Sequence, residues 1–369
     1  MPLSKIQLSE ATGRRNLIIN GAMQHFQRAT AATAAGSGYT TVDRFRGDTS
    51  TDGAFTTEKS TDNPFGTGSS LKAQVTTADT SLAASQYARI IQRIEAQNLQ
   101  HLLYGTSSAK TLTLSFWVKS NKTGIYSIVL VKSDSTAYHF THEYTISSAN
   151  TWEKKVITIT PTAGSTSFIT ASAGAIANDN GIGFELSFGL GQGSNFAIGT
   201  SNTWSSNGNT FASTNQVNWM DNTSNNFYLT QVQLEVGSLT DFEHRSFGEE
   251  LALCQRYFFQ ESTDPDEVGG KYGVANGTAN VTVVHPMPVP MRAAPSVSLT
   301  SAALRVGDTI AFGTTITSGG TISLNGYSGA QSCTYVLGGF SGLTNYRTYL
   351  TEPRDSDGAT GIVKFNAEI

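Results

Sequence analysis

The feature that most constrains the fold of this chain is a series of short segments in which apolar and polar residues alternate. Residues 111–120 (TLTLSFWVKS) show it most clearly, because leucine, phenylalanine and valine occupy every second position. This alternation places the apolar side chains on one face of a β-strand. Gly, Asn, Ser and Pro residues separate the segments, so we predict an all-β fold with an antiparallel β-sandwich or jelly roll. The other strand-like segments are residues 40–46, 71–77, 124–133, 137–146, 152–160, 181–190 and 227–236.

Three regions of the first β-rich unit are harder to interpret. Residues 87–95 (YARIIQRIE) fit both the helical and the strand period, and we favour a strand followed by one or two helical turns over residues 98–105. Residues 47–70 are polar and turn-rich, and no strand is assigned there. Residues 191–226 form a long polar connection that carries Trp204 and Trp219. Large apolar side chains inside a polar loop suggest that the loop folds back onto the sandwich.

The period changes within residues 231–260 (QVQLEVGSLTDFEHRSFGEELALCQRYFFQ). Val232, Leu234 and Val236 alternate with polar residues, as in a strand. Apolar residues then recur every three to four positions over 249–260, which predicts a helix. Ser246 and Glu249 have the spacing of a capping box at its start. A short helix therefore connects two β-rich units.

The second β-rich unit is predicted after this helix. Residues 280–286 (NVTVVHP) alternate, and Pro286, Pro288 and Pro290 predict that this segment lies at a sheet edge. Residues 361–369 (GIVKFNAEI) are expected to form a terminal strand. The predicted architecture is thus a jelly-roll domain, a short connecting helix and a smaller C-terminal β-sandwich domain.

Charge and composition limit the classes of function. The chain has 369 residues, a length typical of two or three domains, and its net charge is −4. Charged residues make up 14% of the chain, against about 25% in ordinary globular proteins, so the clustered Lys and Arg of a nucleic-acid-binding surface are not expected. The N-terminal sequence has no signal-peptide pattern and no segment reaches the ~20 apolar residues of a membrane span. We expect synthesis in a cytoplasm without membrane insertion.

No catalytic or metal-binding motif is recognisable. His139 and His142 lie three apart on a predicted strand and so point to opposite faces, with Glu143 beside the second. This is not the spacing of a zinc protease, and both histidines are expected to be exposed strand residues. Nucleophile-elbow, P-loop and dinucleotide motifs are absent from the sequence. We predict no cofactor and no metal, and we expect Cys254 and Cys333 to be reduced and buried.

Aromatic residues are the one positive functional signal. Exposed Trp or Tyr rings in β-sandwiches can stack against the C–H groups of a sugar ring. The candidates are Trp117, Trp152, Trp204 and Trp219. Trp117 alternates with inward residues and should face outward or against another layer. Trp204, in the polar stretch SNTWSSNGN, is predicted to be the most exposed and is the candidate glycan-binding residue.

Several long motifs resemble a family of bacteriophage virion proteins of the tail fibre and receptor-binding type. They are RRNLIINGAMQHFQR (14–28), YTTVDRF (39–45), KTLTLSFWVKSNKTG (110–124), residues 227–260 and PVPMRAAPSVSL (288–299). The resemblance implies a carbohydrate-binding-like jelly roll over residues 16–245. It also implies a connecting helix over 246–262 and a C-terminal β-rich tip domain over 263–369.

The same resemblance implies a non-enzymatic structural role in the virion. Residues 1–15, with Lys5, Arg14 and Arg15, would be the arm that docks on the particle. The expected partners are other virion proteins of the tail or capsid, a host surface glycan, and further copies of the chain in a homotrimer. The alternatives are a capsid decoration or head fibre protein, a glycan depolymerase, and a carbohydrate-binding module of a secreted bacterial enzyme.

Overall fold

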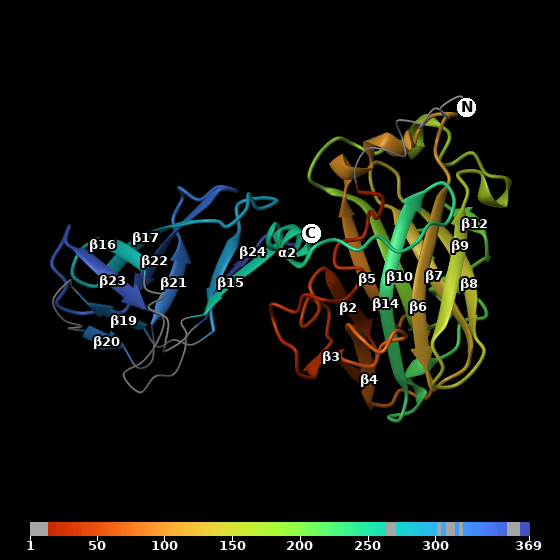
Figure 1. Cartoon of the computed structure of the whole chain (residues 1–369), viewed down its shortest axis with the longest axis horizontal. Helices are drawn as coiled ribbons and strands as arrows, with labels where there is room; N and C mark the ends of the chain where they lie inside the picture. The colour runs from red at the N-terminus through yellow and green to blue at the C-terminus, as the bar shows by residue number, and fades with distance from the viewer. Residues whose placement is uncertain (1–13, 263–270, 301–303, 308–313, 317–319, 353–361) are drawn as a thin grey trace, which may run out of the picture. The chain divides into compact units, whose positions relative to one another are not determined.

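The computed structural model describes residues 14–262, 271–300, 304–307, 314–316, 320–352 and 362–369 (Figure 1). The chain divides into two compact units between Phe247 and Gly248, and each unit has its own hydrophobic core. Both units consist mainly of antiparallel sheets, which confirms the predicted all-β fold class. No helix in the described ranges is both long and apolar enough to cross a membrane.

The first unit is a sandwich of two six-stranded sheets, as predicted. The first sheet consists, in spatial order, of β1 (Thr33–Ala34), β3 (Ala54–Ser60), β4 (Ser70–Thr77), β14 (Asn226–Val236), β6 (Leu112–Ser120) and β9 (Glu153–Ile159). The second consists of β12 (Thr203–Ser205), β8 (Tyr138–Ile146), β7 (Gly124–Lys132), β10 (Ile182–Gln192), β5 (Tyr87–Glu95) and β2 (Phe45–Ser50).

The core between the sheets follows the alternation in the sequence. The apolar residues at every second position of β6, from Leu112 to Val118, belong to this core, and the ring of Phe116 packs edge-on against Phe188 of the opposite sheet at 5.2 Å. The ambiguous segment 87–95 is strand β5, and the 3₁₀ helix η1 (Ala96–Leu102) follows it, which confirms the preferred interpretation.

Strand β3 is not among the predicted strands, and β2 starts at Phe45 instead of near residue 40. The sequence of β3 (AFTTEKS) has one large apolar residue, Phe55, so its alternation is weak. Its next inward residue is Thr57, whose buried hydroxyl is 2.8 Å from the hydroxyl of Thr41. Because an inward threonine is polar, the sequence of β3 does not show the apolar alternation by which a strand is recognised.

The polar connection after β10 folds back onto the sandwich, as predicted. It contains the short strands β11 (Ala197–Gly199) and β13 (Ala212–Ser213), which pair with each other, and the 3₁₀ helix η4 (Trp219–Asp221). Trp219 is fully buried and packs edge-on against Phe55 at 5.7 Å. Aromatic side chains thus anchor this loop.

Residues 14–21 bond to the end of β14 and to the segment that follows it, and we call residues 14–21 and 232–245 the clasp. The carboxylate of Glu243 accepts hydrogen bonds from the backbone N–H groups of Arg15 (3.0 Å) and Asn16 (2.9 Å). The side-chain amide of Asn16 donates to the carbonyl oxygen of Val232 (3.1 Å), and its oxygen accepts from the backbone N–H of Leu234 (3.1 Å). The backbone groups of residues 17 and 234, and of 21 and 232, are also bonded directly.

Polar side chains extend the hydrogen-bond network of the clasp into the interior of the first unit. Arg245 donates to the backbone carbonyls of Asn16 and Ile18. Asn20 is fully buried, and its side-chain amide donates to the carbonyls of His25 (2.9 Å) and Asp43 (3.0 Å). The motif residues of 14–28, 39–45 and 231–245 therefore meet in one structural element.

The division between the units lies within the first turn of helix α2 (Phe247–Gln255), which contains Glu249 and Glu250. The predicted helix over 249–260, and the connecting helix over 246–262, are too long. Residues Phe258–Ser262 form strand β15 instead, and the ring of Phe259 stacks on Phe365 of the neighbouring strand at 5.8 Å. Adjacent aromatic residues satisfy the helical period in the sequence, but strand pairing buries them.

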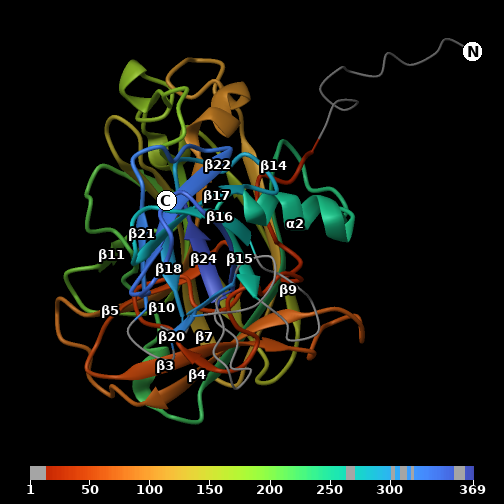
Figure 2. The same cartoon turned by 90° about the vertical axis from the view of Figure 1, so that its left-hand side faces the viewer.

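Two sheets follow in the second unit. Strand β24 (Ile362–Asn366) lies between β15 and β18 (Ser296–Leu299), as Figure 2 shows. The second sheet consists, in order, of β20 (Thr314–Ile316), β19 (Leu304–Gly307), β23 (Thr348–Glu352), β16 (Lys271–Ala275), β17 (Asn280–Pro286), β22 (Ser332–Gly338) and β21 (Thr321–Leu324).

The predicted edge position of β17 is wrong. This strand lies between β16 and β22 and pairs with both. Pro286 is its last residue, and Pro288 and Pro290 lie beyond its end. The prolines therefore end the strand without removing a donor from its middle. Cys254 and Cys333 are both buried and do not form a disulfide with each other, as expected.

Candidate functional site

Trp204, the predicted glycan-binding residue, is buried, so the expectation of an exposed ring is wrong. It is 1% exposed, and its indole N–H donates to the carbonyl oxygen of Thr160 at 2.9 Å. Strand β12 pairs with β8, which places Trp204 opposite Phe140 with 5.4 Å between the ring centroids. A flat stacking platform needs an accessible ring face, and Trp204 does not provide one.

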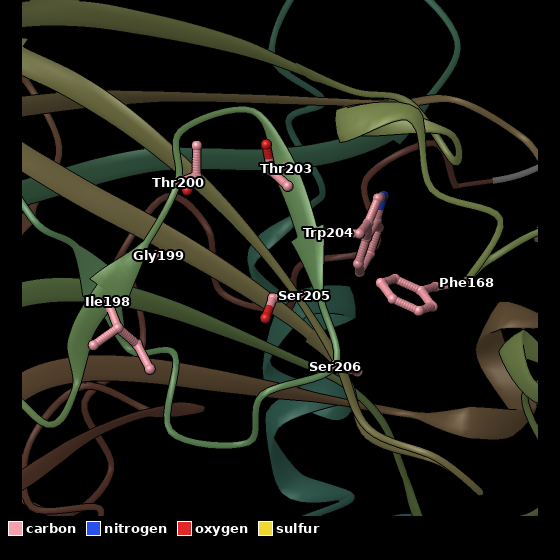
Figure 3. Close-up of a pocket in the computed structure, with 8 residues that line it drawn as sticks. All are labelled: Phe168, Ile198, Gly199, Thr200, Thr203, Trp204, Ser205 and Ser206. Carbon is pink, nitrogen blue, oxygen red and sulfur yellow. The ribbon is translucent and has the colours of Figure 1, made fainter.

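A cavity of about 260 Å³ borders this residue (Figure 3). Figure 3 shows the Trp204 indole beside the ring of Phe168, whereas Thr203 and Ser205 lie on the other side of β12. The remaining lining residues are Ile198, Gly199, Thr200 and Ser206. Several hydroxyl groups line the cavity, but its aromatic wall is mostly covered by protein.

The predicted docking arm lies mostly outside the described residues, and Lys5 is among those not described. Arg14 and Arg15 are exposed at the start of the described chain. The backbone of Arg15 is held by Glu243 of the clasp. The two arginine side chains therefore lie where the chain enters the sandwich.

Aromatic side chains gather instead on the outer surface of the first sheet. We call Phe65, Trp117, Trp152 and Tyr228 the aromatic face. Trp117 on β6 and Tyr228 on β14 point away from the core because Phe116, Val118, Phe227 and Leu229 beside them in sequence point into it. Trp152 precedes β9, and Phe65 is in the connection between β3 and β4.

The four rings are partly exposed and contact one another in two pairs. Phe65 is 51% exposed and meets Trp117 edge-on, with 5.5 Å between centroids. Trp152 meets Tyr228 at 6.0 Å and 67°. Cross-strand pairing of β14 and β9 with β6 fixes the spacing between the two pairs. The aromatic face therefore belongs to a rigid sheet and not to a loop alone.

Lys119 and Asp62 hold the centre of this face. The Lys119 ammonium is 4.3 Å from the ring centroid of Tyr228 and 5.3 Å from that of Trp152, and it forms an ion pair with Asp62. The other oxygen of Asp62 accepts the indole N–H of Trp152 at 2.9 Å. Partial burial favours protonation of Asp62, but the hydrogen bonds from Lys119 and Trp152 outweigh it and lower the pKa of this carboxyl.

A second ion pair lies at the margin of the face. Lys72 on β4 contacts Glu58 on β3 at 2.7 Å, and this hydrogen bond raises the pKa of Lys72. Partial burial raises the pKa of Tyr228, with the nearby carboxylates of Asp62 and Glu58 adding to it and Lys72 opposing it. The phenol is therefore neutral at physiological pH and can both donate and accept hydrogen bonds.

This arrangement combines ring surfaces with fixed polar groups at their edges. Such a surface suits a ligand with apolar C–H faces and hydroxyl groups, which is the chemistry of a carbohydrate. The two carboxylates of the face are engaged by lysines at neutral pH.

Sequence alternation could identify part of this face. It predicts the outward direction of Trp117, and the same rule applies to Tyr228 between Phe227 and Leu229. Trp152 and Phe65 precede a strand or lie in a connection, so no period applies to them. Their convergence depends on which strands are neighbours in the sheet, and a single sequence does not contain that information.

The remaining candidate groups are structural. His139 is buried, with its Nδ1 3.0 Å from the carbonyl oxygen of Thr210, and His142 is half-buried beside Phe140, so the expected exposure of both is wrong. The folded-back connection covers this part of β8. Within the described ranges, no group of three or more His, Cys, Asp or Glu residues could hold a metal ion.

No protein-family model matches the sequence, and no curated protein matches it significantly. Among solved structures, 60% of the chain is similar to the enzymatically active domain of tailspike protein 4 of bacteriophage CBA120. The identity is 13%, the TM-score is 0.30, and 21% of that chain is covered.

Two further structures are sugar-binding modules by their descriptions. A putative sugar binding protein from Bacteroides thetaiotaomicron matches 60% of this chain and 100% of its own, at 13% identity and a TM-score of 0.35. The family 11 carbohydrate-binding module of a Clostridium thermocellum cellulosomal cellulase matches 59% and 99%, at 14% identity and a TM-score of 0.29. Likenesses this distant carry no argument about function.

Proposed function

We propose that this protein is a non-enzymatic virion structural protein of the tail fibre or tip type, which binds a glycan of the host surface through the aromatic face. The observation that carries the binding role is the set of four partly exposed rings on the outside of the first sheet, of which Trp152 and Tyr228 contact Lys119 and Trp152 also contacts Asp62. The second part of the proposal is that this binding surface belongs to a protein of the virion.

The energetics of such a site favour several copies of the chain. Ring stacking contributes about 0.5 to 1.5 kcal/mol and each neutral hydrogen bond a similar net amount. One aromatic face should therefore bind a sugar weakly. A homotrimer, whose copies bind the same surface together, gains affinity through multivalency without any new contact.

The assignment to a virion is supported by the motif resemblance. The residues of RRNLIINGAM and of the 227–260 motif contact one another in the clasp, so they act as a single unit. In this proposal the clasp shapes the domain, the arm over residues 1–15 docks it on the particle, and other virion proteins of the tail are its neighbours. A capsid position and a glycan depolymerase are the alternatives.

The binding role is tested with purified protein and host envelope polysaccharide. Trp152→Ala and Trp117→Ala should each weaken binding about three- to tenfold, the loss expected from one stacking contact. Tyr327→Ala is the matched control, because it removes a ring that is 84% exposed in the second unit. Unchanged binding by both tryptophan variants, with unchanged melting temperatures, would exclude the aromatic face.

The non-enzymatic role is tested in the same assay. Polysaccharide incubated with the protein should keep its chain length, as measured by size-exclusion chromatography. Release of soluble oligosaccharide would identify a depolymerase. Immunogold labelling of intact particles would distinguish a tail position from a capsid position.

A further inference from the structure

The aromatic face has two parts that differ in charge. Around Tyr228 and Trp152 both lysines have a carboxylate partner, as described above, so the charges there cancel. Beside Trp117 and its neighbour Phe65, strand β9 contributes a third lysine, Lys154. Among the residues that the structure describes, none forms an ion pair with Lys154. With three lysines against two carboxylates, the face carries one positive charge that is not balanced.

Strand pairing places Lys154 beside the ring of Trp117. The two residues are directly opposite each other on β9 and β6. Residues paired in this way point to the same side of the sheet, with Cβ atoms about 4.5 to 5.5 Å apart. Trp117 points away from the core, so Lys154 does too, and its side chain is exposed. Strand β9 is the last strand of its sheet, so the ammonium lies at the margin of the aromatic face.

The carboxylate next to Lys154 in sequence does not neutralise it. Glu153 is opposite Val118, which belongs to the core, so Glu153 faces the other side of the sheet. There it forms an ion pair with Lys155 at 2.5 Å and accepts two backbone N–H groups of the preceding turn. Lys154 therefore keeps its charge on the side of the aromatic face.

An ammonium beside an exposed ring suits a particular class of sugar. The ring packs against C–H groups of the sugar, and the ammonium forms a charge-assisted hydrogen bond with an anionic group on the same unit. A neutral sugar uses the ring alone, because its hydroxyl groups compete with water for the strongly hydrated ammonium. The chain has a net charge of −4, so the local charge, and not the protein as a whole, attracts an anion to this site.

We propose that the sugar unit bound at Trp117 carries an anionic group, a carboxylate or a phosphate, and that Lys154 binds this group. The inference rests on the proposed function, because it names the class of glycan that the aromatic face takes. The sugar unit bound at Trp152 is neutral in this proposal, because the side chain of Asp62 is 44% exposed there and repels an anion. Lys154 is thus a specificity-determining residue of the site.

The test measures binding of the full chain to host envelope polysaccharide in three preparations. One is untreated, one has its carboxyl groups reduced to hydroxymethyl groups, and one has its phosphate groups removed. Lys154→Gln, which keeps a polar side chain without the charge, should bind the untreated polysaccharide about two- to fivefold more weakly than the wild type, the loss expected from one exposed charge contact. On the preparation that lacks the anionic group, the variant and the wild type should bind equally. The treatment that abolishes the difference identifies the anion.

Lys59→Gln is the matched control. Lys59 is an exposed lysine on β3 of the same sheet, but it is opposite Leu71, a core residue, and so points to the other side. The control changes the net charge by the same amount and should bind every preparation as the wild type does. Raising the salt from about 0.1 M to about 1 M shortens the screening length from ~10 Å to ~3 Å and should remove the difference between wild type and Lys154→Gln.

The outcomes separate this inference from the proposed function. If the wild type and Lys154→Gln bind the untreated polysaccharide equally at low salt, the inference is overturned and the glycan role stands. An equal loss of binding in Lys59→Gln would also overturn it, because the effect would then come from net charge and not from the position of Lys154. If the wild type binds none of the three preparations, the proposed function fails and this inference fails with it.

Discussion

Gly21, within the NLIINGAM motif, lies where a side chain has no room. A Cβ atom at this position would be 2.1 Å from the carbonyl oxygen of Val232, a backbone atom of the clasp. That oxygen also accepts the side-chain amide of Asn16. The glycine therefore permits the close approach of two backbone segments.

Gly21→Ala should destabilise the first unit by about 2 to 3 kcal/mol, because the clasp must move apart to admit the methyl group. This corresponds to a fall in melting temperature of roughly 4 to 12 °C for a domain of this size. Gly208→Ala is the control, since a Cβ atom at that position would have no atom within 4 Å, and it should melt like the wild type. Equal melting temperatures for both variants would contradict the role of the clasp.

Asp62 should make the aromatic face sensitive to acid. Its pKa in the folded protein is lowered from the ordinary value of 3.8, so the ion pair with Lys119 stabilises the folded state above that pH. The stabilisation is lost as the pH falls through the folded pKa, that is, below about 4. Tryptophan fluorescence measured from pH 6 to pH 2.5 should report this change, because Asp62 also accepts the Trp152 N–H.

Asp62→Asn removes the titrating group. The variant should lack the fluorescence transition seen in the wild type below pH 4. If its transition has the same midpoint and amplitude, the signal arises from general acid unfolding and not from this carboxylate.

At the scale of elements, the clasp shows which part of the N-terminus belongs to the fold. Removal of residues 1–15 should leave the melting temperature of the first unit nearly unchanged, because Arg14 and Arg15 are exposed. Removal of residues 1–20 also deletes Asn16, Ile18 and Asn20, which are buried, and should prevent folding of the first unit. Thermal melts followed by circular dichroism compare the two truncations.

The first truncation also tests the docking arm. A folded protein without residues 1–15 should no longer be incorporated into particles. Incorporation at normal occupancy would move the docking role to another segment, and a folded protein without residues 1–20 would contradict the structural role assigned to Asn16 and Asn20.

Strands and helices with a clear apolar period are predictable from the sequence. Elements whose structure depends on the strands they pair with are not. Strands β6 and β14 can be located because their inward residues are large and apolar. Strand β3 is not predicted because one of its inward residues is the polar Thr57. The end of α2 is predicted too late because Phe258 and Phe259 fit the helical period as well as the strand period. Trp204 shows the same limit at the candidate site, since polar neighbours in sequence do not reveal that β12 joins a sheet and turns the indole inward.

The polar faces of strands are also difficult to predict. Gln233 and Glu235 alternate with apolar residues of β14, which normally indicates exposure, yet both are buried. The segment after β14 folds over them, and the side-chain oxygen of Gln233 accepts the backbone N–H of Glu243 at 2.8 Å. Such coverage comes from tertiary contacts that strand periodicity does not encode.

At the scale of the whole molecule, the chain has two separate hydrophobic cores. Because each unit buries its own apolar residues, the first should fold without the second. A fragment of residues 14–247 should give a cooperative thermal transition within about 3 °C of one of two transitions in the full chain. A single transition in the full chain, together with an unfolded fragment, would show that the units depend on each other.

The clasp also determines how the first unit would respond to tension. The chain enters the sandwich near Arg15 and leaves it beyond Arg245, and these two points are tied together through Asn16 and Glu243. A stretching force applied between residue 14 and residue 247 is therefore borne by the bonds of the clasp, which include the end of β14, before it reaches the rest of either sheet. As long as these bonds hold, the force should not act across the rest of the sandwich, and the aromatic face should keep its shape.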